Sequence, residues 1–215
     1  MFRTISIAGF VVTFVGIAVC CAVFPCRKEC RWSPIEVLRR LVHLFTLLFL
    51  EQKLSPPGVL RKLVYLLALL CFVVLVITGF YPSLAQGQLI SGYFIMVHTT
   101  AGGVFAVCLA VLAVMWAHSC RFNKGDWPWL QQLLRREIMN KEHPVEKSWL
   151  GQKICFWLIV SLAIPLILSI VLSMFPFFGT NWQELLLSTH RYIALLLALV
   201  IIVHTYLLIR TQMKE

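Results

Sequence analysis

Five long apolar stretches, separated by shorter polar ones, dominate the pattern of the chain. They cover residues 4–24, 63–81, 93–117, 154–178 and 185–209. About 20 apolar residues in a row are enough to cross a bilayer as a helix. No Asp, Glu, Lys or Arg occurs between residues 63 and 120. The pattern therefore predicts an all-α integral membrane protein with five transmembrane helices.

The segment 33–54, between the first two stretches, has a different pattern. Its apolar run, residues 41–50, is too short to span a membrane. Ser33 followed by Pro34 is typical of a helix start, and charged residues stand at both ends of the run. We therefore expect one interfacial helix that lies on the cytoplasmic surface of the membrane.

The first stretch has the position of a signal peptide but not its chemistry. It begins with a single basic residue and has no small-x-small cleavage site, which favours a retained anchor helix. The predicted domains are an N-terminal region, 1–60, with the anchor and interfacial helices, and a four-helix domain, 61–215.

Composition and charge exclude a soluble domain. The chain is 60% hydrophobic and 13% charged, with a mean hydropathy of +0.86. Its net charge of +10 could suggest nucleic acid, but 17 of the 19 Lys and Arg residues lie in 27–62, in 121–153 or after residue 209. By the positive-inside rule these segments face the cytoplasm, with the N-terminus outside and the C-terminus inside. This basic face suggests that a partner subunit docks there; membrane lipid is a further expected partner, and nucleic acid is not.

The ionisable side chains inside the predicted spans are nearly all histidines. His190 and His204 are 14 residues apart, so on one helix they lie about 21 Å apart and are rotated by only about 40°. They point the same way at two depths, which is the geometry that two stacked haems need. For either histidine alone, a place in the interface or a bond to another helix is an equal alternative. The pair favours haem ligation.

A third histidine, His98, is predicted at the same depth as His190, and the two form a candidate outer pair of haem ligands. Gly102, one turn beyond His98, leaves room for a porphyrin face or for close helix packing. Arg191 would neutralise a haem propionate or extend to the lipid headgroups.

The inner haem would use His204 and needs a second ligand. His118 lies 20 residues after His98, about 30 Å further along and about 160° around the helix. It is therefore interpreted as an interfacial histidine. His43, on the predicted interfacial helix, is on the correct side and is the preferred second ligand. The eight cysteines match no zinc or iron–sulfur spacing and are interpreted as packing residues and ordinary thiols.

Residues 60–210 resemble the di-haem cytochrome b subunits of membrane-bound formate dehydrogenases, Ni–Fe hydrogenases and thiosulfate reductases. The resemblance is carried by Thr78-Gly79, by His98 followed by Gly102, and by His190-Arg191 with His204. It implies two b-type haems in the bacterial inner membrane, the outer one held by His98 and His190 and the inner one partly by His204. It also implies a quinone site near one haem.

The chain departs from this family at Tyr65, where the family has its other inner ligand. Tyr65 would ligate weakly, hydrogen-bond a quinone or simply pack. Proton exchange at the quinone would fall to a residue at the cytoplasmic boundary such as His43, Tyr65 or Glu51.

We therefore expect an electron-transfer subunit of a respiratory oxidoreductase complex. It would pass electrons between an iron–sulfur or flavoprotein subunit and the quinone pool, menaquinone or ubiquinone. The alternative is a haem-free membrane anchor or assembly subunit, which would not depend on the three histidines. A transporter is disfavoured because no Asp or Glu lies deep in any span.

Overall fold

The computed structural model describes residues 1–23, 56–123, 126, 144–175 and 179–212. Its elements are α1 (Phe2–Val23), α3 (Pro56–Tyr81), the π-helical turn η1 (Pro82–Gln86), α4 (Tyr93–Ala117), α6 (Pro144–Ser173) and α7 (Gly179–Gln212). Five of these helices are long and apolar enough to cross a membrane. This confirms the predicted all-α membrane fold with five transmembrane helices. The predicted interfacial helix, 33–54, falls outside the described residues.

Prolines mark several helix boundaries. α3 begins at Pro56, and α6 begins at Pro144, ten residues before the apolar stretch that predicted it. The first turn of a helix has no internal use for the N–H that proline lacks. Pro165 lies inside α6, which continues through it. At the end of η1, Gly87 takes a left-handed φ of 68°, and its N–H bonds the carbonyl of Pro82.

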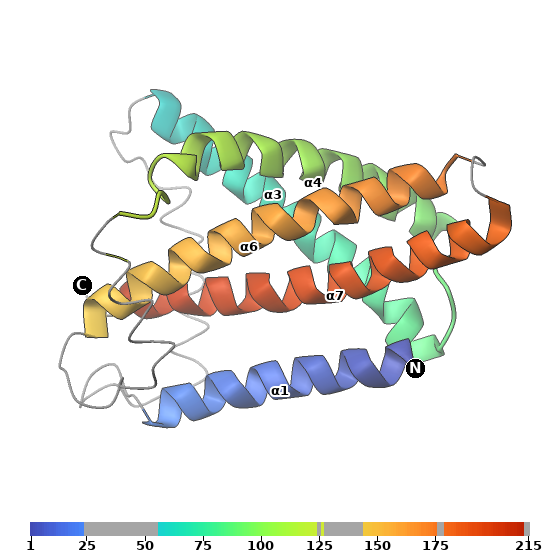
Figure 1. Cartoon of the computed structure of the whole chain (residues 1–215), viewed down its shortest axis with the longest axis horizontal. Helices are drawn as coiled ribbons and strands as arrows, with labels where there is room; N and C mark the ends of the chain where they lie inside the picture. Colours follow the sequence, from blue (N-terminus) through green and yellow to red (C-terminus); the bar gives the residue numbers. More distant parts are fainter. Residues whose placement is uncertain (24–55, 124–125, 127–143, 176–178, 213–215) are drawn as a thin grey trace.

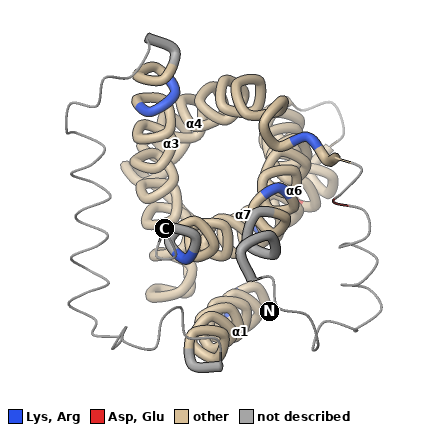
Figure 2. Tube along the Cα trace, turned by 90° about the vertical axis from the view of Figure 1, so that its left-hand side faces the viewer, with Lys and Arg blue, Asp and Glu red and all other residues tan. Residues whose placement is uncertain are grey.

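The helices form a four-helix bundle with one helix added outside. Seen end-on, α3, α4, α6 and α7 form a ring, and α1 lies outside it (Figure 2). The most extensive contacts join α6 to α7 and α3 to α4, and α1 packs mainly on α7. Because α4 also contacts α6, the order around the ring is α3, α4, α6, α7, and α4 and α7 stand diagonally across it (Figure 2). The helices run alternately up and down, so the described ends of the chain lie at opposite ends of the bundle (Figure 1).

The main core cluster draws its side chains from all four helices of the ring. Its buried members are Ala68, Cys71, Phe105, Cys108, Leu112 and Leu197, with Ile159 and Leu162 of α6 packed against them. Large apolar side chains on the outer faces are exposed, for example Leu70, Val107 and Val114. Such faces are suited to lipid, where an apolar surface has no water to avoid.

A second, smaller cluster joins α1 to the bundle. Phe80, Leu195 and Ala198 are buried, and Phe2 and Phe10 of α1 pack against them. Gly9 leaves space for a side chain of α7, because a Cβ at this position would lie 3.2 Å from Cδ1 of Leu199. α1 is therefore attached to α7 through a close helix contact.

Basic residues gather at the end of the bundle where α3 and α6 begin and where α4 and α7 finish (Figure 2). They are Arg61, Lys62, Arg121, Lys153 and Arg210. Arg3 and Arg191 belong to the opposite end. The separation of charge predicted from the sequence is thus a separation in space within the described residues.

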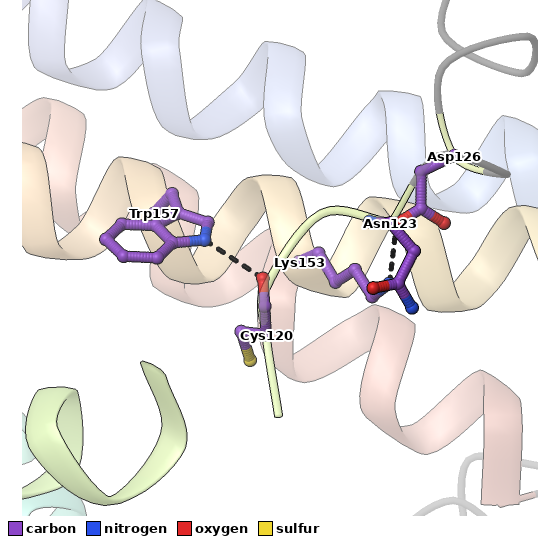
Figure 3. A network of polar contacts seen from close by, with 5 residues as sticks. All are labelled: Cys120, Asn123, Asp126, Lys153 and Trp157. Carbon is purple, nitrogen blue, oxygen red and sulfur yellow. Dashed lines mark hydrogen bonds and ion pairs between the residues drawn. The ribbon is translucent and has the colours of Figure 1, made fainter. Parts of the chain in front are cut away.

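A polar network at the basic end ties the chain that follows α4 to α6 (Figure 3). Lys153 Nζ lies 2.7 Å from Asp126 Oδ2, and the N–H of Asn123 donates to the same oxygen at 2.8 Å. Trp157 Nε1 donates to the carbonyl of Cys120 at 3.0 Å. The hydrogen bond from Lys153, followed by that from Asn123, holds the pKa of the Asp126 carboxyl below its usual value.

Candidate functional site

His98 stands near the start of α4, and its ring is bonded to α3. Its Nδ1 lies 2.8 Å from Oγ1 of Thr78. The Thr78 hydroxyl also lies 2.7 Å from the carbonyl oxygen of Val74, which can only accept. The hydroxyl proton therefore goes to Val74, and Oγ1 accepts a proton from Nδ1 of His98. In this tautomer Nε2 of His98 keeps a free lone pair, the form that binds a metal.

Gly79 makes room for the same ring. A Cβ at this position would lie 3.1 Å from Cε1 of His98, tighter than almost any real contact of its kind. The Thr78-Gly79 pair, a weak signal in the sequence, thus has two physical roles at one histidine. Thr78 bonds the ring and Gly79 leaves space for it.

His190 stands on α7, and its ring is bonded to α6 in a similar way. Its Nδ1 lies 3.0 Å from the carbonyl oxygen of Leu166. Ser169 Oγ lies 3.5 Å from the same nitrogen and donates to the Leu166 carbonyl at 2.8 Å. Because a carbonyl only accepts, Nδ1 of His190 carries the proton. Its Nε2 also keeps a free lone pair.

The two rings belong to diagonal helices, α4 and α7 (Figure 2). His98 is the sixth residue of α4, and His190 is the twelfth residue of α7. Both lie towards the end of the bundle that holds the N-terminus. The structure therefore places both histidines towards the same end of the bundle, and their pairing at one haem stays a prediction.

His204 follows His190 by 14 residues on the same continuous helix, about 21 Å along it. Its Nδ1 is buried and has no hydrogen-bond partner among the described residues. A buried polar atom is nearly always bonded, because leaving it unpaired costs about 1–3 kcal/mol. The Nδ1 of His204 thus needs a hydrogen-bond partner that the described residues do not supply.

Two of the candidate second ligands of the inner haem, His118 and Tyr65, lie in the described residues. His118 is the C-cap of α4 and is exposed, in line with an interfacial histidine. The Tyr65 ring packs on Trp116 with 5.6 Å between the centroids and adjoins the main core cluster. His43 and Glu51 lie outside the described residues.

Arg191 is held by two groups that sequence reasoning missed. Its Nη2 donates to Oγ of Ser83 at 3.1 Å, and its Cζ lies 4.2 Å from the ring centroid of Phe2. No carboxylate among the described residues pairs with it. Ser83 lies 108 residues away in the chain, and no spacing rule could have found it.

No close contact with a neighbouring helix requires glycine at positions 102 and 103. A Cβ at Gly102 would meet only Cδ2 of Leu75, at an ordinary 3.8 Å, and one at Gly103 would meet nothing within 4 Å. Of the two explanations weighed from the sequence, close helix packing is therefore the weaker. Room for a flat group beside His98 is the explanation that the contacts favour.

The residues present fit a haem better than a metal ion held by protein alone. Within the described residues there is no group of three or more His, Cys, Asp or Glu that could hold a metal ion. A haem brings four nitrogens of its own and needs only one imidazole on each face. His98 and His190, each with a free Nε2, meet that requirement.

Comparison with known families points to the same chemistry. A family model described as prokaryotic cytochrome b561 matches residues 65–214. The match covers α3 from Tyr65 onwards, η1, α4, α6 and α7, and leaves α1 outside. No curated protein and no solved structure matches the chain.

Proposed function

The chain belongs to the prokaryotic cytochrome b561 family, and we propose that it passes electrons between a redox partner subunit and a quinone through two b-type haems. Membership makes it a b-type cytochrome of electron transfer and a multi-pass protein of the inner membrane. The number of haems, the quinone and the partner are the proposed part. They rest on the narrower resemblance to di-haem subunits together with the residues described above.

One observation carries the proposal: His98 and His190 stand on diagonal helices, each with Nδ1 bonded to a neighbouring helix and Nε2 free. Two imidazoles so arranged suit the two faces of one haem, the outer one. His204, which follows His190 by 14 residues on the same helix, would hold the inner haem. His43 would serve as its second ligand.

The described residues would each have a defined part in this site. Bound haem supplies an iron that accepts and returns one electron at a time. The imidazoles would bind the iron, and their acceptors would hold the Nδ1 protons in place. Arg191 would bind a propionate carboxylate, because its guanidinium has donors beyond the one used by Ser83. The apolar bundle around them excludes water.

The basic end of the bundle would face the cytoplasm, with the N-terminus outside. Its cluster of Lys and Arg residues makes it the proposed docking surface for an iron–sulfur or flavoprotein subunit, which would present acidic groups. Electrons would then enter or leave through the inner haem on this side.

Reduced-minus-oxidised absorption spectra of the purified chain test the proposal. The wild type should show b-type bands, and His190→Ala should lose about half of their amplitude because one of two haems goes. His118→Ala is the matched control, since this histidine is exposed at the end of α4, and it should keep the full amplitude. A wild type without b-type bands would favour the alternative, a haem-free anchor or assembly subunit.

A further inference from the structure

The three histidines of the bundle differ in what holds their Nδ1 atoms. His190 is bonded to a backbone carbonyl at 3.0 Å, and His204 has no partner among the described residues. His98 alone is bonded to a side chain, the hydroxyl of Thr78, at 2.8 Å. A side-chain acceptor is one that a single substitution can remove without disturbing the backbone.

Thr78 is itself fixed in place. It is only 5% exposed, and its hydroxyl donates to the Val74 carbonyl one turn earlier in α3 at 2.7 Å. That bond, together with the branching at Cβ and the burial of the side chain, limits the rotation of Thr78 about χ1. The remaining lone pair of Oγ1 therefore points in a fixed direction, towards Nδ1 of His98.

The same edge of the ring also lies against Gly79. Its Cε1 lies where a side chain on Gly79 would begin, 3.1 Å from a Cβ built there. A hydrogen bond at Nδ1 and the space that Gly79 leaves beside Cε1 let this edge of the ring lie close against α3. The orientation of His98 is thus determined by two consecutive residues of α3.

We propose that Thr78 is a positioning residue that sets both the orientation of His98 and the redox potential of the outer haem. The inference rests on the proposed function, because it takes His98 as an axial ligand. An acceptor at Nδ1 makes the imidazole a stronger electron donor at Nε2. Stronger donation favours oxidised iron, so Thr78 lowers the midpoint potential of the outer haem.

Two substitutions at Thr78 separate its hydroxyl from its methyl group. Thr78→Val keeps the shape and removes the acceptor, and Thr78→Ser keeps the acceptor and removes the methyl group. In a potentiometric titration of the purified holoprotein, Thr78→Val should raise the midpoint potential of one haem and leave the other unchanged. Its haem retention should fall about 10- to 100-fold, as is usual when an outer-shell partner of a ligand is lost. Thr78→Ser should stay close to the wild type in both measurements.

Thr189→Val is the matched control. Thr189 is adjacent to His190, and its hydroxyl donates to the Leu185 carbonyl of its own helix at 2.8 Å, just as Thr78 bonds Val74. The substitution removes the same back-bond without removing an acceptor from a histidine. Both midpoint potentials should remain at their wild-type values.

The inference is overturned if both potentials in Thr78→Val equal those of the wild type, or if Thr78→Ser shifts them as much as Thr78→Val does. Should Thr78→Val bind no haem at the outer site, haem retention in Thr78→Ser decides: retention supports the role of the hydroxyl, and loss overturns it. His98→Ala separates this failure from failure of the proposed function. If His98→Ala keeps every haem, the ligand assignment is wrong; if it loses one while Thr78→Val changes nothing, only the role of Thr78 is wrong.

Discussion

The Nδ1 atoms of His98 and His190 are each bonded to a different neighbouring helix, α3 for the first and α6 for the second. Each bond selects a tautomer and a ring plane before any cofactor binds. A ligand held in this way loses little conformational freedom when it coordinates a metal. The two acceptors, a hydroxyl and a backbone carbonyl, both accept the Nδ1 proton of their histidine.

Gly79 provides the most local prediction. Gly79→Ala places a Cβ 3.1 Å from Cε1 of His98, so the ring must move by a few tenths of an ångström. We expect haem retention to weaken about 10-fold, measured as haem per protein after dilution or competition with apo-myoglobin. Alanine favours a helix over glycine by about 1 kcal/mol, so a general loss of helix stability is not the cause.

Gly16→Ala is the control for this prediction, since Gly16 lies on α1, away from the histidines, and a Cβ there meets nothing within 4 Å. It gains the same helix propensity and should keep wild-type haem retention. Equal losses in the two variants would show that the space beside His98 has no special role.

At the scale of the elements, α1 is attached to α7 and lies outside the residues that match the family. Gly9→Leu should overpack its contact with Leu199 and cost about 1–3 kcal/mol, seen as a lower melting temperature in detergent. Gly16→Leu, on the same helix but with nothing within 4 Å, should leave the melting temperature unchanged or slightly higher. Equal melting temperatures for the two variants would contradict the close contact of α1 with α7.

The network between the end of α4 and the start of α6 predicts a dependence on pH. The pKa of Asp126 is held below its usual value by the hydrogen bonds from Lys153 and Asn123. A carboxyl with a lowered folded pKa adds stability that is fully present above its unfolded pKa, about 3.9, and is lost as the pH falls through the folded value. The wild type should therefore melt above Asp126→Asn at pH 6, and the two melting temperatures should converge below about pH 4.

The control is Glu184→Gln, which removes an exposed carboxylate from the opposite end of the bundle. Its melting temperature should follow that of the wild type at every pH. A gap between the wild type and Asp126→Asn that stays constant with pH would mean that the carboxylate charge does not stabilise the network.

At the scale of the whole molecule, hydropathy predicted the architecture because a membrane imposes its thickness on every span. α4 covers Tyr93–Ala117, as the apolar stretch indicated. α6 begins ten residues early, at Pro144, because a helix can continue beyond the hydrocarbon as a polar segment. Hydropathy reports where the chain meets lipid, and so it cannot show where such a helix starts.

The site was predictable only in part. The spacing of His190 and His204 on one helix follows from the helical repeat. The groups that hold the site do not, since Thr78, Ser83 and the Leu166 carbonyl come from other helices. Hydrogen-bond partners on different helices depend on the packing of the bundle. Every residue has a backbone carbonyl, so the sequence cannot show which one accepts from a histidine. The two residues of α3 that contact His98 were recognised only by resemblance.

The central claim is that His98 and His190 hold the same haem. Haem content by pyridine haemochrome in His98→Ala, His190→Ala and the double variant tests it most directly. Because the two histidines are assigned to the two faces of one haem, each single variant should lose one haem equivalent, and the double variant should lose no more than either. A double variant that loses more haem than each single variant, or single variants that lose none, would contradict the claim.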